Sequence, residues 1–218
     1  MDEVKVKNIF AAVFEKKVLD PLLAVLDPKE VKFWGTEGTV KYLKSKGFNA
    51  QSVVSGFDFD GRLKSINKQV FAAVLADRSN KRHLEELLKL AKYSSSDPSP
   101  SGEGESRSLS TLSSRPKGSR QARTINNFEP FDLVVVDLYK PDSQNFPESM
   151  DIGGQALIRA AIKNYKNVAL AFGAGSIKEL AEHFKANQGQ TLLAFRKAQA
   201  KKAAKFIAER SKLEAKLF

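Results

Sequence analysis

The stretch DIGGQALIRAAIKN, which begins at Asp151, combines an acid, two glycines and two cations in a helix-like run. Asp151 is of a type that caps a helix, and Gly153 and Gly154 would let a ligand approach the backbone. Arg159 and Lys163 lie four residues apart, so both cations would share one helix face. Helix capping alone would also account for Asp151, and salt bridges would account for Lys163.

The inventory of reactive side chains limits the chemistry. The chain has no cysteine and only two histidines, His83 and His183. Both histidines lie in charged helical runs, which favours a solvated helix face over a metal or catalytic role. The lack of thiols excludes disulfides, thiolate metal ligands and cysteine nucleophiles. Any general acid or base must therefore be Asp, Glu, Lys or Tyr.

Two further motifs are suited to anions. GTEGT would expose the amides at a helix N-terminus beside the hydroxyls of Thr36 and Thr39, which suits a phosphate. DGRLKS would point Arg62 and Lys64 to one side of an extended stretch, a cationic pair suited to an anionic ligand. Many strand-to-helix turns look like the first motif, and a solvated loop also explains the second.

These motifs follow apolar runs that alternate with helical patterns. The patterns predict strands at 6–14, 31–35, 50–54, 131–139 and 167–172, and helices at 18–26, 39–47, 81–93, 153–164 and 176–186. Continuous apolar strands predict burial on both faces of a parallel sheet. We therefore expect a doubly wound, three-layer α/β/α fold with a mainly parallel sheet, whose ligand site follows the carboxyl ends of the strands.

The length of 218 residues suits a single domain over 1–218. Residues 94–127 are rich in Ser, Gly, Pro and Arg and lack apolar periodicity. They are predicted to form a disordered, low-complexity insert, for which a tolerated surface loop is the simplest interpretation. No apolar run reaches the length of a membrane helix and the start lacks a signal peptide, so a cytoplasmic protein is expected.

The formal net charge is +11, and 196–216 alone holds eight Lys or Arg against two Glu. This segment belongs to a closing basic helix predicted over 190–218, with Phe206, Leu213 and Leu217 spaced to dock on the core. A basic balance favours nucleic acid, acidic membranes or phosphorylated ligands. A solvated helix face explains the lysines more simply, because Lys and Ala are also good helix formers.

Four motifs together resemble the IMP cyclohydrolase domain of the bifunctional purine-biosynthesis enzyme, which has a methylglyoxal-synthase-like fold. That family carries a GGT turn, here GTEGT, and a DGRVKT loop, here DGRLKS. It also carries DLVVVNLYPF, here DLVVVDLYKP, and NIDIGGPTMVRAAAKN, here SMDIGGQALIRAAIKN. The resemblance covers nearly the whole chain and leaves nothing for the formyl-transferring domain, so a free-standing cyclohydrolase is expected.

The resemblance implies dehydrative ring closure of 5-formamidoimidazole-4-carboxamide ribotide to IMP, without a metal or cofactor. The family's catalytic group falls on Lys64, Tyr139, Asp151 and Lys163. Asp151 and Lys163 would act on the attacking nitrogen, and Lys64 and Tyr139 on the formyl oxygen. The residues implied in binding the substrate and its phosphate are Lys16, Gly35, Thr36, Gly38, Thr39, Arg62, Ser65, Ile152, Gly153 and Gly154.

The chain departs from the family at several binding positions. SVSDKT in the first strand is here AVFEKK, which keeps Lys16 but replaces two serines by Ala12 and Phe14. Glu37 replaces a glycine of the phosphate turn, Asp137 replaces an asparagine, and INKQVFAA replaces LHPKVHGG. A nucleotide-sensing domain without catalysis is therefore an alternative, as is a basic nucleic-acid-binding protein.

The expected partners follow from the same resemblance. The substrate would be a small nucleotide, supplied by a separate formyltransferase, and a homodimer is possible. A methylglyoxal synthase shares the fold, but that family relies on a histidine, and neither histidine follows a predicted strand here. Nucleic acid and membranes are not expected as partners.

Overall fold

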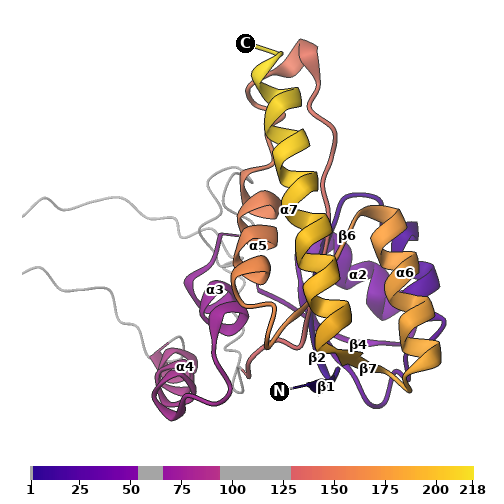
Figure 1. Cartoon of the computed structure of the whole chain (residues 1–218), viewed down its shortest axis with the longest axis vertical. Helices are drawn as coiled ribbons and strands as arrows, with labels where there is room; N and C mark the ends of the chain where they lie inside the picture. Colours follow the sequence, from indigo (N-terminus) through magenta and orange to yellow (C-terminus); the bar gives the residue numbers. More distant parts are fainter. Residues whose placement is uncertain (1, 54–65, 94–128) are drawn as a thin grey trace, which may run out of the picture.

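The computed structural model describes residues 2–53, 66–93 and 129–218 (Figure 1). Its strands are β1 (Glu3–Lys5), β2 (Asn8–Val13), β3 (Lys32–Gly35), β4 (Asn49–Ser52), β5 (Leu133–Asp137), β6 (Ala169–Phe172) and β7 (Gln190–Leu192). Its α-helices are α1 (Asp20–Leu23), α2 (Glu37–Ser45), α3 (Lys68–Leu75), α4 (Lys81–Tyr93), α5 (Ile152–Lys163), α6 (Gly173–Ala186) and α7 (Leu193–Ala215). Two 3-10 helices are η1 (Lys16–Leu19) and η2 (Ser143–Asn145). Within these residues, no helix is both long and apolar enough to span a membrane.

Five strands form one parallel sheet in the order β4-β3-β2-β5-β6. The chain winds outward from β2 through β3 to β4, and then crosses to β5 on the other side of β2 and on to β6. The direction of winding therefore reverses between β2 and β5. In open parallel sheets, the crevice beyond the carboxyl ends of the strands at such a point is the usual ligand site.

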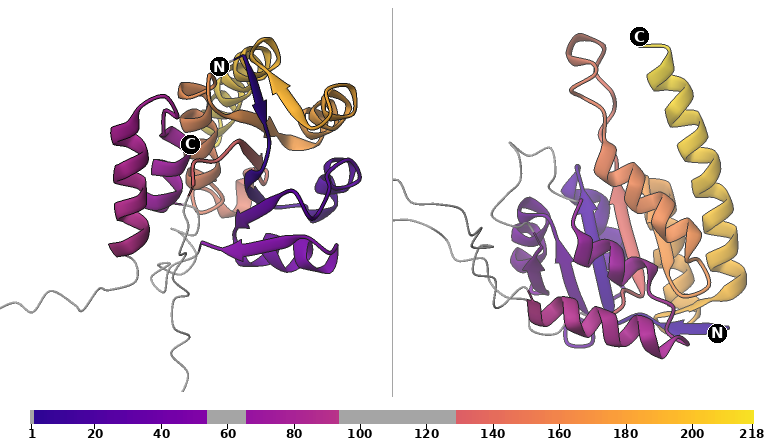
Figure 2. Two further views of the ribbon diagram at one scale, coloured as in Figure 1. Left: turned by 90° about the horizontal axis from the view of Figure 1, so that it is seen from below. Right: turned by 90° about the vertical axis from the view of Figure 1, so that its left-hand side faces the viewer.

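Helices cover both faces of this sheet, as two views at right angles show (Figure 2). Successive strand residues point to opposite faces and so feed two separate apolar cores. Phe10 and Val134 belong to the core under α3, α5 and α7, whereas Ile9 and Val135 belong to the core under α1, α2 and α6. The predicted three-layer α/β/α fold is confirmed.

Helix α3 and the strands β1 and β7 were not predicted from the sequence. Helix α3 begins after Asn67, whose side chain accepts hydrogen bonds from the backbone N–H groups of Gln69 at 2.8 Å and Val70 at 3.3 Å. Strands β1 and β7 form a separate antiparallel pair of three residues each. The closing helix consequently begins at Leu193 rather than 190, because the three residues before it belong to β7.

Helix α7 docks through a face different from the predicted one. Leu213 is 46% exposed, although Phe206 packs against the core. The buried residues of α7 are Arg196, Gln199, Ala200, Ala203, Ile207, Arg210 and Glu214. Most of these side chains are polar, so hydrogen bonds as well as apolar contacts hold the helix in place.

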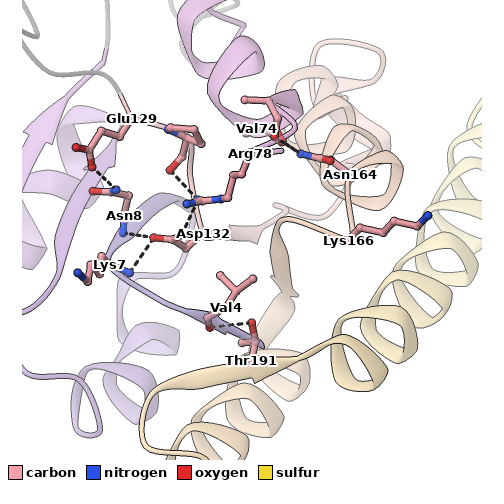
Figure 3. Close-up of polar contacts among 12 residues, drawn as sticks. Val4, Lys7, Asn8, Val74, Arg78, Glu129, Asp132, Asn164, Lys166 and Thr191 are labelled. Carbon is pink, nitrogen blue, oxygen red and sulfur yellow. Dashed lines mark hydrogen bonds and ion pairs between the residues drawn. The ribbon is translucent and has the colours of Figure 1, made fainter. Parts of the chain in front are cut away.

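Asp132, the residue before β5, ties together the amino ends of the two central strands (Figure 3). Its Oδ2 atom accepts hydrogen bonds from the backbone N–H groups of Lys7 at 2.8 Å and Asn8 at 2.7 Å. Its Oδ1 atom lies 2.5 Å from Arg78 Nη2, which also donates to the carbonyl of Pro130 at 3.0 Å. Burial raises the pKa of Asp132, and the charge of Arg78 opposes that rise.

Arg78→Met should destabilise the protein by about 3 kcal/mol at neutral pH, because it leaves the buried Asp132 carboxylate without its cation. Burial raises the pKa of Asp132, so ionising this carboxyl destabilises the folded protein. That destabilisation develops as the pH rises through the pKa and is absent at a pH below it. The loss of unfolding free energy in Arg78→Met should therefore be smaller at a pH low enough to protonate Asp132. Urea unfolding of wild type and variant, at neutral pH and at that lower pH, measures the difference. An equal loss in an Asp132→Asn background would mean that Arg78 acts through packing alone.

Candidate functional site

The residues that follow β2 and β5 contact each other at the point where the winding reverses. The backbone N–H of Phe14 donates to Asp137 O at 3.2 Å, and the N–H of Glu15 donates to Asp137 Oδ2, also at 3.2 Å. The rings of Phe14 and Tyr139 lie 5.8 Å apart, centroid to centroid. Burial raises the pKa of Asp137. The ends of the two strands therefore form one continuous surface.

Tyr139 and Asp151 are brought together by the loop between β5 and α5. The Tyr139 hydroxyl donates to the carbonyl of Met150 at 3.0 Å, and Asp151 is the next residue. Burial raises the pKa of Asp151 and also that of Tyr139, and the Asp151 charge raises the pKa of Tyr139 further. A carboxylate whose pKa is raised toward neutral is a better general base than an ordinary aspartate.

Asp151 is also the N-cap of α5. Its Oδ1 atom accepts a hydrogen bond from the backbone N–H of Gly154 at 2.7 Å. A Cβ atom at residue 154 would lie 2.3 Å from Leu138 Cδ2 and 2.8 Å from Asp151 Oδ1, so any larger residue would displace both side chains. Gly153 is buried and the side chain of Ile152 is exposed, which leaves the N-terminal amides of α5 next to the carboxylate. Capping and chemistry are thus compatible roles for Asp151.

The GTEGT turn lies across β2 from this pair and leads into α2. Gly35 ends β3 so close to β2 that a Cβ atom would lie 2.2 Å from Ala11 O. Thr36 is the N-cap of α2, but its side chain makes no capping hydrogen bond; its hydroxyl lies 3.2 Å from that of buried Thr39. The first amides of α2 are therefore not capped by Thr36, as an anion site requires.

Lys16 reaches this turn from the end of β2. A Cβ atom at Gly38 would lie 3.9 Å from Lys16 Nζ. The ammonium donates to the carbonyls of Val13 at 2.6 Å and Phe14 at 2.7 Å, and burial lowers the pKa of Lys16. An ammonium has three N–H groups, so one remains for a ligand. The Glu37 side chain is exposed at the start of α2.

Lys163 lies far from this site within the same chain. At 1.5 Å and 100° per residue, Lys163 is about 18 Å along the α5 axis from Asp151 and about 120° around it. It lines an open pocket of about 630 Å³ between α3, α5 and α7, together with Phe71, Leu75, Arg159, Ala160, Ile162, Ala204 and Ile207. The structure therefore does not bring Lys163 next to Asp151 within a single chain.

Other predicted positions are not covered. Arg62, Lys64 and Ser65, together with the predicted insert at 94–127, lie outside the described residues. In the ranges that are described, no group of three or more His, Cys, Asp or Glu side chains is placed to hold a metal ion.

Three residues of the site region were missed by sequence reasoning. Arg210 of α7 donates to the carbonyl of Tyr139, and its Nε lies 3.2 Å from Glu214 Oε1. The same Glu214 oxygen accepts a hydrogen bond from Gln155 Nε2 of α5 at 2.8 Å. One signal was available in the sequence. Arg210 and Glu214 are four residues apart, and both fall on the same helix face as Ala203 and Ile207, which is the buried face of α7.

Fold and site together define a doubly wound α/β domain with its candidate site at the switch point, consistent with a methylglyoxal-synthase-like fold. In the curated proteins, the chain is similar to the bifunctional purine biosynthesis protein PurH. PurH of Rhizobium etli (strain CIAT 652) is 27% identical over 214 residues, which cover 93% of this chain and 33% of that protein. PurH of Clostridium kluyveri (strain ATCC 8527) is 28% identical over 209 residues, covering 90% and 34%.

The chain thus spans about a third of the length of the curated relatives that it matches. PurH of Cutibacterium acnes is 29% identical over 188 residues, which cover 81% of this chain and 30% of that protein. Among solved structures, ForH has the same fold, with a TM-score of 0.66, 21% identity and coverage of 97% of this chain and 98% of that chain. No family model matches the sequence.

Gly154→Ala should destabilise the protein by about 2 kcal/mol, because the added methyl group overlaps Leu138 and the Asp151 carboxylate. Gly175→Ala is the matched control in α6, where a Cβ atom meets nothing within 4 Å. The control should gain up to about 1 kcal/mol from helix propensity. Thermal unfolding of both variants measures the difference, and equal stabilities would contradict the close packing around Gly154.

Proposed function

We propose that this chain is an IMP cyclohydrolase that closes the purine ring of 5-formamidoimidazole-4-carboxamide ribotide. The proposal is supported by similarity to PurH over most of the chain. The observation that carries it is that Tyr139, which follows β5, lies beside Asp151 at the start of α5, while Lys16 follows β2 and the start of α2 lies on the other side of that strand. Acid–base groups and an anion site would then contact opposite ends of one nucleotide.

The reaction needs proton transfers but no oxidant or reductant. The carboxamide nitrogen attacks the formyl carbon and loses a proton, which the Asp151 carboxylate accepts. The formyl oxygen is protonated, for which the Tyr139 hydroxyl is the nearby donor. Loss of the formamido N–H proton and cleavage of the C–O bond then release water and leave the aromatic ring. The two hydrogens of the water come from the two nitrogens, so the reaction is balanced.

The environment of Asp151 suits its part as the base. Burial raises the pKa of Asp151, so the carboxylate binds the amide proton more strongly than a solvated aspartate would. The N-terminal amides of α5 adjoin Asp151 and can stabilise negative charge that develops on the formyl oxygen. Holding both reacting groups of one molecule in this crevice lowers the entropic part of the barrier.

The 5′-phosphate would bind at the start of α2. The uncapped amides near Gly38, the Thr36 hydroxyl and the remaining N–H of Lys16 provide donors for its oxygens. Lys64 as a group that polarises the formyl oxygen, and Arg62 and Ser65 as phosphate contacts, remain part of the proposal on the strength of the sequence resemblance alone.

Purified protein should convert formamidoimidazole carboxamide ribotide to IMP, followed by absorbance. Asp151→Asn should lower kcat at least about 100-fold, because general acid–base catalysis contributes this much and the amide cannot accept the proton. Glu182→Gln, an exposed carboxyl of α6, serves as the matched control and should keep wild-type activity. Binding of IMP without turnover by the wild type would contradict the proposal and indicate a nucleotide-sensing domain.

Two lysines should respond differently to the same substitution. Lys16→Met should raise KM about tenfold or more, because it removes a charge-assisted contact to the phosphate. Lys163→Met should change kcat/KM less than about threefold, since α5 geometry keeps Lys163 about 18 Å from Asp151. Steady-state kinetics of both variants test this contrast.

A large loss in Lys163→Met would contradict the single-chain site. It would require Lys163 to come from a second copy of the chain. A mixture of Asp151→Asn and Lys163→Met proteins would then regain activity, because some shared sites would carry both native residues.

A further inference from the structure

Helix α7 brings a buried ion pair to the candidate site. The side chains of Arg210 and Glu214 are only 7% and 8% exposed, and their N–O distance is 3.2 Å. Arg210 donates to the Tyr139 carbonyl, and Glu214 accepts from Gln155, which lies in the first turn of α5 just after Asp151. The pair therefore connects the residues that follow β5 to the helix that Asp151 caps.

We propose that Arg210 and Glu214 are positioning residues that fix the position of Tyr139 relative to Asp151. Neither of them needs to touch the substrate. Arg210 fixes the backbone of the loop on one side of Asp151, and Glu214 fixes α5 on the other side through Gln155. Figure 2 shows the corresponding arrangement, in which the second half of α7 runs beside the start of α5 and the loop that precedes it.

The ion pair also acts electrostatically on Asp151, with opposite effects from its two members. The described groups whose charge acts on the Asp151 carboxyl are Asp137 of β5 and Arg210 and Glu214 of α7, while Tyr139 is a titratable neighbour. Burial is the main cause of the raised pKa of Asp151; the Arg210 charge lowers that pKa, and the Glu214 charge raises it. Removing one charge at a time should therefore move the pKa in opposite directions.

This inference rests on the proposed function only for its catalytic consequence. The direct test is the Asp151 carboxyl titration, followed by carbon NMR in the ligand-free protein. Arg210→Met should raise the pKa of Asp151 and Glu214→Gln should lower it, each by about 0.5 pH unit or more. A base must be ionised to act, so the acid limb of the kcat profile should shift to higher pH in the first variant and to lower pH in the second.

An exposed pair on the same helix provides the matched control. Glu209 and Lys212 form an ion pair at 2.9 Å with side chains that are 71% and 69% exposed. Glu209→Gln and Lys212→Met should leave the Asp151 titration unchanged. Arg210→Lys keeps the charge and should restore most of the wild-type pKa, which separates electrostatics from packing if Arg210→Met unfolds.

Shifts in the same direction in both Arg210→Met and Glu214→Gln, or no shift in Glu214→Gln, would overturn the proposal. If the wild type makes no IMP, the proposed reaction fails, yet the NMR titration still decides whether the ion pair acts on Asp151. Failure of the proposed ring closure is thus distinguishable from failure of the proposed role of Arg210 and Glu214.

Discussion

A single buried carboxylate at one end of the sheet determines where the candidate reacting groups lie at the other end. Asp132 precedes β5 and binds the two backbone N–H groups at the start of β2, so both central strands begin from one fixed point. From there the register runs from Ile9 opposite Leu133 to Val13 opposite Asp137. A slip of one residue would displace Tyr139 by about 3.3 Å and turn the strand's side chains to the other face.

The parts of the fold that could be predicted from sequence are those with strong local signals. The apolar runs of β2, β3, β5 and β6 are buried on both faces, and Asp151 before a glycine pair is a typical helix start. β1 and β7 have three residues each and exist only because they pair across the fold. Helix α3 is short and apolar on most sides, so its periodicity is weak and only the Asn67 cap marks its beginning.

Only some residues of the candidate site could be named from the sequence. The family resemblance implied Lys16, Tyr139 and Asp151, and the structure has all three beyond the carboxyl ends of β2 and β5, where parallel strands deliver such residues to one edge of the sheet. The same resemblance grouped Lys163 with Asp151, but a resemblance between sequences carries no distances, and the length of α5 separates the two residues within one chain. Arg210 and Glu214 were overlooked for another reason: charges in a lysine-rich helix suggest a solvated face, whereas burial of these two depends on tertiary contacts.

The continuity of α7 has a mechanical consequence. This helix of 23 residues is about 34 Å long. It starts where Leu193 N donates to Asp2 O at 2.7 Å, beside the β1–β7 pair, and its other end carries Arg210 and Glu214. As one continuous helix, it connects the small antiparallel pair to the loop around Tyr139. Packing against β6, β7 and α5 together sets the angle at which this helix meets the loop around Tyr139, so a displacement at one end would be transmitted to the other.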